Sequence, residues 1–494
     1  MRDSHRYAAW QALRRFIETP LDQLLSGDCE SGRRAALDLF DQARHEVPAY
    51  AAFLRDHGVD GEAIVRSGAF HEIPFTTRAN YVNRWPLPAR CWHGELAANG
   101  MVALSSGSTG TPAIWPRTVA DELQTAIRFE QVFRDMFHAD QRPTLAIVCF
   151  ALGSWVGGMY TAACMQHLSS KGYPITCITP GSNRSEILRA FAELSPMFEQ
   201  TVLLGYPPFL KDVIDEGSST GLRWDATEMH LVTAGEVFSE GWRELMAERV
   251  GCADAGRFAA SLYGSADAGV LAIETPLSAA IRGWLALHPS AARDMFGGSR
   301  MPTFMQYDPQ CRTFESNGGA LAFTADGGAP QIRYDMLDEG GVAGFAAMTE
   351  RLTAAGFRME DVGGTIRSMP FVWVFGRRDF TVSYYGANIY PEQALAALER
   401  REIAEWATGR FVMLVEADGE HNSTLRFHIE LARGATDTPE RRQTATAALA
   451  EVLVSSNSEF ANYVPAAKQI PSITLWPTGA PEFFATKGKH RYTR

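Results

Sequence analysis

The chain has 494 residues, of which 46% are hydrophobic and 21% are charged, so it can build an ordinary globular core. Its length suggests about three domain-sized units. The formal net charge is −11 and no basic block stands out, which disfavours nucleic-acid binding because that function needs a dense cationic face. The seven cysteines include no CxxC pair, so neither a zinc cluster nor a redox dithiol is supported.

No segment approaches the length of an apolar membrane span, and the first residues lack the apolar region of a secretory signal. We therefore expect a soluble cytoplasmic protein that has no membrane partner. The first hundred residues are predicted to form helices and loops, since residues 35–58 carry apolar side chains at helical spacing.

From residue 101 onward, short apolar runs rich in β-branched residues alternate with amphipathic helical stretches. The predicted strands are 101–106, 144–150, 174–180, 201–206, 229–236 and 257–265. Helices are predicted over 120–137 and 183–198. This alternation predicts an α/β domain with mixed and parallel sheets, in which ligands lie beyond the carboxyl ends of the strands.

The pattern changes near residue 378. Residues 371–391 indicate two strands around a charged turn, and a helix is predicted over 391–406. Strands at 410–418 and 425–431, a helix at 438–455 and a strand at 472–477 complete a compact α+β unit. The sequence therefore predicts a large N-terminal α/β domain over 1–378 and a small C-terminal α+β domain over 379–494.

The stretch ALSSGSTGTPAIW at 103–115 is too polar to pack in a core. Such Gly/Ser/Thr clusters are usually plain loops, but their hydroxyls and backbone N–H groups also suit phosphate oxygens. A Walker loop is excluded, because counting from Gly107 puts Pro112 and Ala113 where Gly-Lys is required. The GxGxxG dinucleotide motif and HExxH are also absent.

Seven stretches in chain order carry a more specific signal. They are LSSGSTGTP (104–112), TAGEVFS (233–239), SLYGSADAG (261–269), IRYDMLD (332–338), GRRDF (376–380), GANIYP (386–391) and KGKHR (487–491). In this order they resemble the adenylate-forming superfamily of acyl-CoA synthetases and adenylation domains. Residues 72–88, 150–160 and 203–210 are similar to motifs of its phenylacetate–CoA ligase branch.

This resemblance implies an ATP site. The β- and γ-phosphates would lie against Ser105, Ser106, Gly107, Ser108, Thr109 and Gly110. The ring of Tyr263 would stack on adenine. Ala234, Gly235 and Glu236 would form the other wall of the adenine site, and Gly264 and Ser265 would also bind ATP. The ribose would be bound by Asp338 with help from Arg377.

The resemblance also assigns the chemistry. Asp267 stands at the magnesium-binding acidic position, and aspartate is a hard oxygen ligand that suits Mg²⁺. Lys489 matches the catalytic lysine, and Asp379 falls at the hinge about which the small domain would be mobile. Gly386 and Asn388 would line a tunnel for the thiol acceptor.

Structural alternatives stay open at several of these positions. Tyr263 could be packing filler, Asp267 a solvated surface charge, and Lys489 part of a solvated basic tail. Arg333, beside the ribose motif, could be a structural ion-pair partner. The chain also departs from the family pattern, since Ala113 stands where many relatives carry a lysine, Ala266 replaces a hydroxyl, and Met336–Leu337–Asp338 replaces Thr-Gly-Asp.

The expected reaction is that of a carboxylic acid with MgATP, giving an acyl-adenylate and then a thioester with coenzyme A. The branch favours aryl acids, and the glycine and aromatic residues at 150–160 suit a flat or small acid. Two alternatives remain: an adenylating enzyme whose acceptor is an amine, another nucleophile or a carrier protein, and a non-catalytic ATP-binding relative. Relatives are often dimers, so a homodimer is one arrangement that the resemblance suggests.

Overall fold

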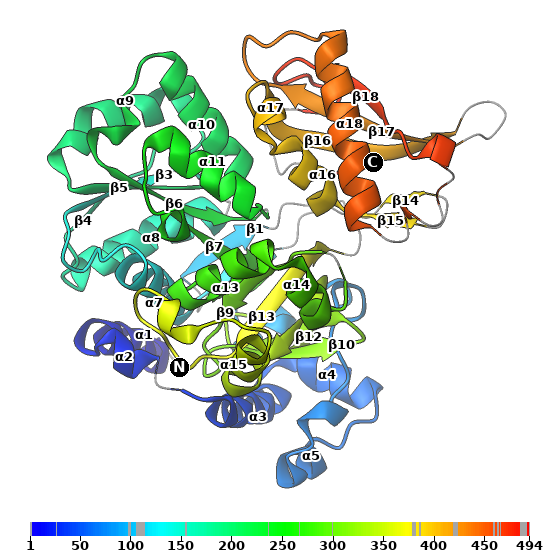
Figure 1. Cartoon of the computed structure of the whole chain (residues 1–494). Coiled ribbons are helices and arrows are strands. Elements are labelled where there is room, and N and C mark those ends of the chain that lie inside the picture. Colours follow the sequence, from blue (N-terminus) through cyan, green and yellow to red (C-terminus); the bar gives the residue numbers. More distant parts are fainter. Residues whose placement is uncertain are drawn as a thin grey trace.

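The structure is a computed structural model. It describes residues 2–25, 27–96, 100–104, 114–153, 156–235, 237–265, 267–298, 300–377, 382–384, 387–417, 423–457, 460–461, 464, 466–484 and 492–493. The predicted division into a large α/β part and a smaller α+β part is confirmed in outline (Figure 1). The predicted boundary at residue 378 lies outside the described residues.

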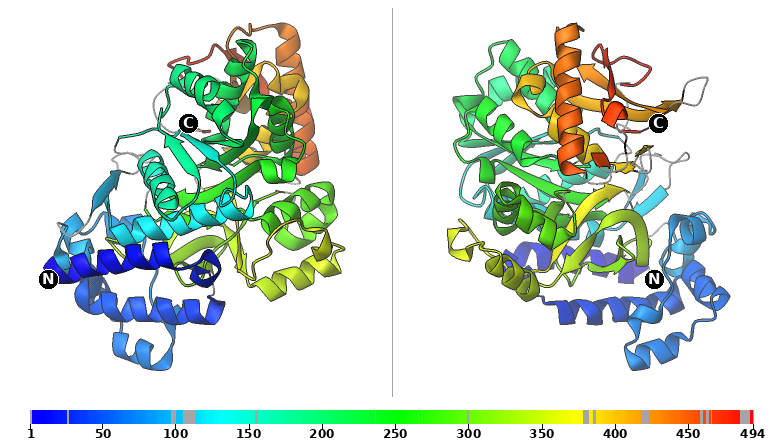
Figure 2. Two further views of the ribbon diagram at one scale, coloured as in Figure 1. Left: turned by 90° about the vertical axis from the view of Figure 1, so that its left-hand side faces the viewer. Right: turned by 45° about the vertical axis from the view of Figure 1, so that its right-hand side comes forward.

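The chain begins with helices that lie along the base of the large domain (Figure 2). They are α1 (Arg2–Glu18), α2 (Leu21–Leu24), α3 (Cys29–Glu46), α4 (Pro48–Asp56) and α5 (Gly61–Ser67). The helical pattern predicted over 35–58 is thus confirmed, but it is divided between α3 and α4 at Val47 because Pro48 starts a new helix. A further short helix, α6 (Leu87–Arg90), precedes the hairpin of β1 (Met101–Leu104) and β2 (Ile114–Arg117).

Within the described residues, eleven strands form one large mixed sheet in the order β10-β11-β12-β13-β9-β8-β7-β6-β5-β3-β4. The strands from β3 to β7 pair in parallel, and the pairs from β7 through β8 and β9 to β10 are antiparallel. The bounds are β3 (Thr144–Val148), β4 (Ile175–Ile178), β5 (Gln200–Gly205), β6 (Glu228–Ala234), β7 (Ala259–Ser265), β8 (Gly269–Ile273), β9 (Thr303–Gln306), β10 (Thr313–Asn317), β11 (Ala320–Ala325), β12 (Gln331–Ala343) and β13 (Phe371–Arg377). The six predicted strand runs coincide with β1 and β3 to β7.

Helices connect these strands and cover the sheet (Figures 1 and 2). They are α7 (Val119–Asp135), α8 (Val156–Ser170), α9 (Arg184–Leu194), α10 (Pro207–Ser219), α11 (Glu240–Val250), α12 (Ala255–Phe258), α13 (Pro276–Leu287), α14 (Pro289–Phe296) and α15 (Phe345–Ala354). The predicted helices over 120–137 and 183–198 are α7 and α9. Both begin at side-chain caps, Thr118 and Asn183, that accept from backbone N–H groups of the first turn.

The small domain is built on a separate three-stranded sheet in the order β16-β17-β18, with its own core around Phe411, Phe427 and Leu449. Its elements are β14 (Val382–Tyr384), β15 (Ala387–Ile389), α16 (Pro391–Leu398), α17 (Arg401–Ala404), β16 (Ala407–Ala417), β17 (Ser423–Leu431), α18 (Pro439–Ser456) and β18 (Ser472–Trp476). The predicted helix over 391–406 is interrupted after Leu398. The strands predicted within 371–391 belong to different sheets, because β13 pairs with β9 and β12 whereas β14 pairs with β15.

The two domains meet where α10 and α11 lie beside α17 and the start of β16 (Figure 1). The buried ammonium of Lys211 on α10 donates to the carbonyl oxygens of Ala404 (3.0 Å) and Ala407 (2.8 Å), and to Asp215 (2.9 Å). Burial lowers the pKa of Lys211, and the negative charge of Asp215 opposes that shift. Ser239 of the large domain donates to the carboxylate of Glu399 in the small domain.

Candidate active site

The ends of β6 and β7 form the first part of the candidate site. These strands are parallel, so their carboxyl ends reach the same edge of the sheet, with Ala234 opposite Leu262. Gly235 follows β6 with a φ of +82°, and a Cβ there would lie 2.8 Å from the ring of Tyr206. Both the backbone angle and the close contact therefore require glycine at this position.

The turn between β7 and β8 carries the candidate metal ligand. Tyr263 and Gly264 lie near the end of β7, and Asp267 follows in the turn to β8. A Cβ at Gly264 would lie 2.6 Å from the carbonyl oxygen of Gly269, so the antiparallel pair can close this tightly only with glycine. The tight turn places Asp267 at the same edge of the sheet as Tyr263.

Strand β12 supplies the second half of the site. Its pairing with β11 shifts register between Leu321 and Ala322, and Leu337 has a left-handed φ of +63°. A left-handed, non-glycine residue beside a bulge redirects the side chains around it. The register places Asp338 opposite Arg377 of β13, which brings the two predicted ribose-binding positions side by side in the sheet.

Two tyrosine–aspartate hydrogen bonds join these halves. The hydroxyl of Tyr263 donates to Oδ2 of Asp338 over 2.6 Å. The hydroxyl of Tyr334 donates to Oδ2 of Asp267 over 2.9 Å. Tyr263 of β7 thus holds Asp338 of β12, Tyr334 of β12 holds Asp267 in the turn after β7, and both carboxylates are held at defined positions. Sequence reasoning missed Tyr334, although its spacing from Asp338 repeats that of Tyr263 from Asp267.

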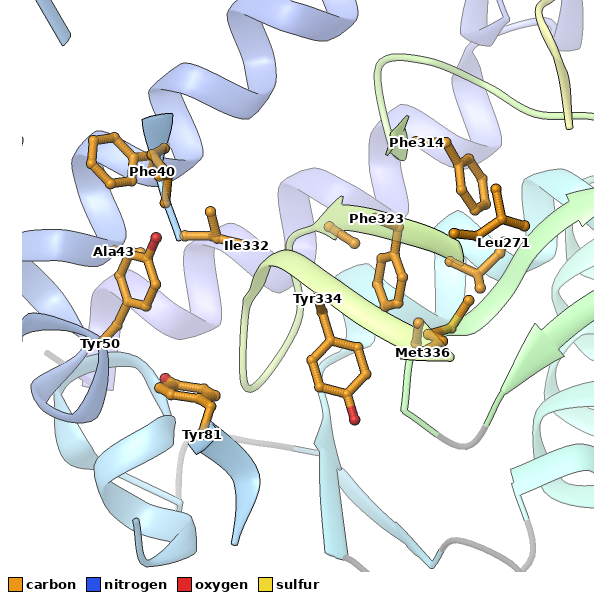
Figure 3. Close-up of a cluster of buried hydrophobic side chains, with 14 of the residues drawn as sticks. Phe40, Ala43, Tyr50, Tyr81, Leu271, Phe314, Phe323, Ile332, Tyr334 and Met336 are labelled. Atoms are coloured by element: carbon orange, nitrogen blue, oxygen red, sulfur yellow. The ribbon is translucent and has the colours of Figure 1, made fainter. Parts of the chain in front are cut away.

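The rings of these tyrosines rest on a shared apolar layer. Tyr263 stacks on Phe314 with 6.2 Å between ring centroids, and Tyr334 packs edge-on against Phe323 at 5.8 Å. Figure 3 shows Tyr334 and Met336 on β12 beside these phenylalanines. Tyr263 is therefore packed as well as hydrogen-bonded, which restricts the motion of its hydroxyl.

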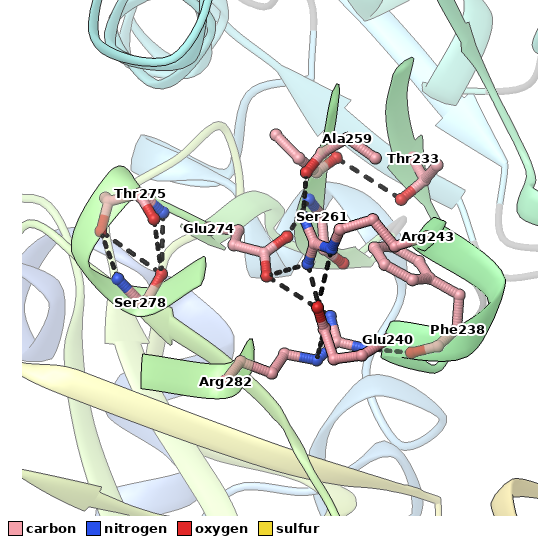
Figure 4. Close-up of polar contacts among 11 residues, drawn as sticks. Thr233, Phe238, Glu240, Arg243, Ala259, Ser261, Glu274, Thr275, Ser278 and Arg282 are labelled. Atoms are coloured by element: carbon pink, nitrogen blue, oxygen red, sulfur yellow. Dashed lines mark hydrogen bonds and ion pairs between the residues drawn. The ribbon is translucent and has the colours of Figure 1, made fainter. Parts of the chain in front are cut away.

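Behind β7, a buried network of charges attaches α11 and α13 to the sheet (Figure 4). Glu274 accepts from the backbone N–H of Ser261 (3.0 Å) and pairs with Arg243 (2.6 Å), while Glu240 contacts both Arg243 and Arg282. Burial alone would lower the pKa of Arg243, but the carboxylates of Glu274 and Glu240 raise it above its ordinary value. Ser261 lies two residues before Tyr263 on β7. This network therefore fixes the position of the strand that carries Tyr263.

Arg333 is a structural residue, as one of the two sequence-based interpretations proposed. Its guanidinium pairs with Glu315 (2.9 Å) and donates to the carbonyl oxygen of His71 (2.6 Å), and it is 6% exposed. These contacts fasten the segment before α6 to β12. Arg333 thus holds β12, the strand that carries Tyr334 and Asp338.

Several predicted site residues lie outside the described residues. They are Ser105, Ser106, Gly107, Ser108, Thr109, Gly110, Glu236, Asp379, Gly386 and Lys489. Arg377 and Asn388 are placed only as backbone, in β13 and β15. The structure therefore brings together Ala234, Gly235, Tyr263, Gly264, Ser265, Asp267 and Asp338, and the roles of the other residues stay predictions.

No family model matches the chain, and no curated protein matches it. Among solved structures, the chain is similar to 2-hydroxyisobutyryl-CoA ligase in the postadenylation state with R3-HIB-AMP, at a TM-score of 0.66 and 14% identity over 97% of this chain and 91% of that chain. The same ligase with 2-HIB-AMP gives a TM-score of 0.62 at the same identity and coverage. The chain has the fold of an acyl-CoA ligase.

This likeness confirms the fold that the ordered motifs predicted. The thioesterification state of the same 2-hydroxyisobutyryl-CoA ligase, with 2-HIB-AMP and CoA, gives a lower TM-score of 0.52 at 14% identity and 97% and 91% coverage. None of the described helices is long and apolar enough to cross a membrane.

Proposed function

We propose that the protein is an AMP-forming acid–CoA ligase. An oxygen of the acid's carboxylate attacks the α-phosphorus of ATP, forming the acyl-adenylate and releasing pyrophosphate. The thiol of coenzyme A then attacks the acyl carbon and AMP leaves. The observation that carries this proposal is the pair of tyrosine–aspartate hydrogen bonds, which hold Asp267 and Asp338 at one sheet edge on an acyl-CoA ligase fold.

Each side chain has a task in this proposal. Asp338 accepts the ribose hydroxyls, and Tyr263 presents its ring to adenine while its hydroxyl holds Asp338. In this proposal, the backbone of Ala234 and Gly235 at the end of β6 forms the other wall of the adenine site. Lys489 brings a positive charge to the acid oxygen and the α-phosphate, where negative charge accumulates in the transition state.

Asp267 fits a magnesium ion carried by ATP. Within the described parts of the chain, no three His, Cys, Asp or Glu side chains gather as a metal site. Mg²⁺ in nucleotide sites usually takes one or two carboxylates and completes its shell with phosphate oxygens and water. When bound, it would neutralise phosphate charge, and Asp267 would orient it.

The substrate is proposed to be an aryl or small carboxylic acid, as in the phenylacetate–CoA ligase branch that the sequence motifs resemble. ATP and coenzyme A are cytoplasmic metabolites, and we propose that the enzyme acts there. The deciding experiment is ATP–pyrophosphate exchange over a panel of aryl, acyl and amino acids with and without Mg²⁺. Exchange that requires both an acid and Mg²⁺ supports adenylation, and no exchange with any acid contradicts it. Adding coenzyme A, an amine or a carrier protein then identifies the acceptor.

A further inference from the structure

Arg300 contacts both domains through one side chain. It belongs to the large domain, just before β9, and its side chain is 13% exposed. Its Nη1 pairs with Glu339 of β12 at 2.7 Å, and its Nη2 donates to the carbonyl oxygen of Phe375 in β13 at 2.9 Å. The same Nη2 lies 3.6 Å from Oε2 of Glu392, in the first turn of α16 in the small domain. One guanidinium thus pairs with a carboxylate from each domain.

The guanidinium also contacts an aromatic ring from each domain. Its carbon lies 4.6 Å from the ring centroid of Phe375 and 3.5 Å from that of Tyr390, the residue before α16. A planar guanidinium can stack on aromatic faces while its N–H groups reach carboxylates at the rim. Since Tyr390 directly follows β15, this contact holds the chain where β15 leads into α16.

Gly376 leaves room for the carboxylate of Glu392. It has a left-handed φ of +108°, and a Cβ there would lie 2.8 Å from Oε1 of Glu392. Gly376 also stands opposite Glu339 in the pairing of β12 with β13. The large domain thus offers a seat for the first turn of α16, which we call the Arg300 seat. It consists of Arg300, Glu339, Phe375 and Gly376.

Helix α16 is also held at its other end, where Glu399 accepts from Ser239 of the large domain. Glu392 and Glu399 stand seven positions apart, about two helical turns, so they lie on one face of the helix. Burial raises the pKa of Glu392, the charge of Arg300 opposes that shift, and Glu339 adds to it. The carboxylates of Glu339 and Glu392 therefore repel each other, and Arg300 offsets that repulsion.

We propose that Arg300 is a positioning residue for the small domain, because it clamps the first turn of α16 and so fixes the orientation of that domain on the large one. Its effect on catalysis rests on the proposed function, in which the two half-reactions use different orientations of the small domain. Any rotation that lifts α16 off the Arg300 seat breaks the contacts with Glu392 and Tyr390 together. Arg300 would then set how the protein divides between the arrangements that serve the two steps.

The test compares Arg300→Met, Arg300→Lys and the double variant Arg300→Met/Glu392→Gln in the full chain. The matched control is Arg367→Met, since the side chain of Arg367 is 10% exposed and pairs with Asp135 at 2.6 Å inside the large domain. Three measurements need no substrate: the melting temperature, the radius of gyration by small-angle scattering, and the hydrogen exchange of backbone amides in β12, β13 and α16. The rates of ATP–pyrophosphate exchange and of thioester formation from supplied acyl-adenylate are then compared.

Arg300→Met leaves the carboxylates of Glu339 and Glu392 near each other without a cation. We therefore expect a larger radius of gyration and about tenfold faster hydrogen exchange where α16 meets the Arg300 seat. Arg300→Lys should show a smaller effect, because an ammonium keeps the charge but lacks the planar fork. The double variant should recover much of the slow hydrogen exchange, since it removes the repulsion.

The ratio of the two half-reaction rates should change about threefold or more in Arg300→Met, because releasing α16 depopulates the arrangement seen here. An unchanged radius of gyration together with unchanged hydrogen exchange would overturn the proposal. A lower melting temperature with an equal fall in both half-reactions, as expected for Arg367→Met, would overturn it as well, because a residue that only stabilises the fold behaves in this way. If the unaltered protein shows no pyrophosphate exchange with any acid, the proposed function fails, and the scattering and hydrogen-exchange results still decide whether Arg300 holds the small domain.

Discussion

Tyr263 donates its hydroxyl to Asp338 over 2.6 Å and so connects the end of β7 to β12, two strands that three others separate in the sheet. Tyr334 and Asp267 repeat the connection in the opposite direction. The carboxylates proposed for ribose and for magnesium are therefore held by the same two segments. We therefore expect a substitution in one tyrosine–aspartate pair to alter the position of the other pair's carboxylate.

Replacing Tyr263 by Phe removes this hydroxyl and keeps the ring. Because a hydrogen bond to a charged group contributes about 1.5–3 kcal/mol, we expect the Kd of MgATP to rise about tenfold or more. Calorimetric titration of the purified variant measures this directly. Tyr263→Ala, which also removes the ring, should lose more. An unaltered Kd in Tyr263→Phe would mean that Asp338 needs no support from the hydroxyl.

Asp267→Ala should abolish ATP–pyrophosphate exchange, whereas Asp267→Glu should keep much of it, since Mg²⁺ needs a charged oxygen and water can adjust the length of the arm. Tyr334→Phe leaves the carboxylate in place but less oriented. It should therefore raise the Mg²⁺ concentration for half-maximal exchange and leave the maximal rate nearly unchanged. Exchange at the full rate in Asp267→Ala would rule out the magnesium assignment.

Lys489→Ala should slow exchange about a hundredfold to a thousandfold, the usual effect of losing one preorganised group that stabilises transition-state charge, about 3–4 kcal/mol. The same variant should still convert supplied acyl-adenylate to thioester, because we propose that the small domain rotates between the half-reactions and carries Lys489 away. Lys487→Ala is the matched control and should change neither step by much. Equal losses in both half-reactions, or a greater loss in Lys487→Ala, would contradict this role.

Lys211→Met should loosen the attachment of the small domain. It removes three hydrogen bonds, two of them to carbonyl oxygens of the small domain at Ala404 and Ala407. We expect a larger radius of gyration by small-angle scattering and faster proteolysis between the domains. Lys171→Met is the control, because Lys171 pairs with Glu130 inside the large domain at 2.8 Å. Lys171→Met should lower the melting temperature without changing the radius of gyration. A radius of gyration in Lys211→Met equal to that of the unaltered protein would refute the prediction.

The domain interface should weaken as the pH rises. Burial raises the pKa of Glu399 to about 7, and burial likewise raises that of Asp212 to about 7. An unfolded carboxyl titrates near pH 4, so between about pH 4 and 7 the folded protein binds more protons than the unfolded chain. The contribution of these two protonated carboxyls to the free energy of unfolding is complete below pH 4 and is lost as the pH rises through 7.

Urea unfolding of the whole chain at pH 5, 6, 7 and 8 measures this dependence. Glu399→Gln should reduce the slope of unfolding free energy against pH, and the contribution of Asp212 should remain. The control is Glu451→Gln, since Arg400 lowers the pKa of the exposed Glu451 out of this range. A slope in Glu399→Gln equal to that of the unaltered protein would show that Glu399 does not titrate there.

The sequence by itself predicted the elements whose patterns are local. The β-branched runs at β3 to β7 and the capped helices α7, α9 and α18 follow from hydrophobic periodicity and from the residues next to each end. The order of the motifs likewise predicted the acyl-CoA ligase fold. Breaks within elements were missed, as at Val47 and Leu398, because a short interruption scarcely alters the periodicity around it.

Only the tertiary structure decided which distant residues meet. Nothing in the local pattern assigns β13 to the large sheet or brings Tyr334 to Asp267, since both depend on how β12 pairs and where its bulges fall. The burial of Arg90 against Trp115 is equally invisible in the short helix that carries it. The physical reason is that hydrogen bonds, ion pairs and desolvation act through space, whereas periodicity reports only the neighbours of a residue along the chain.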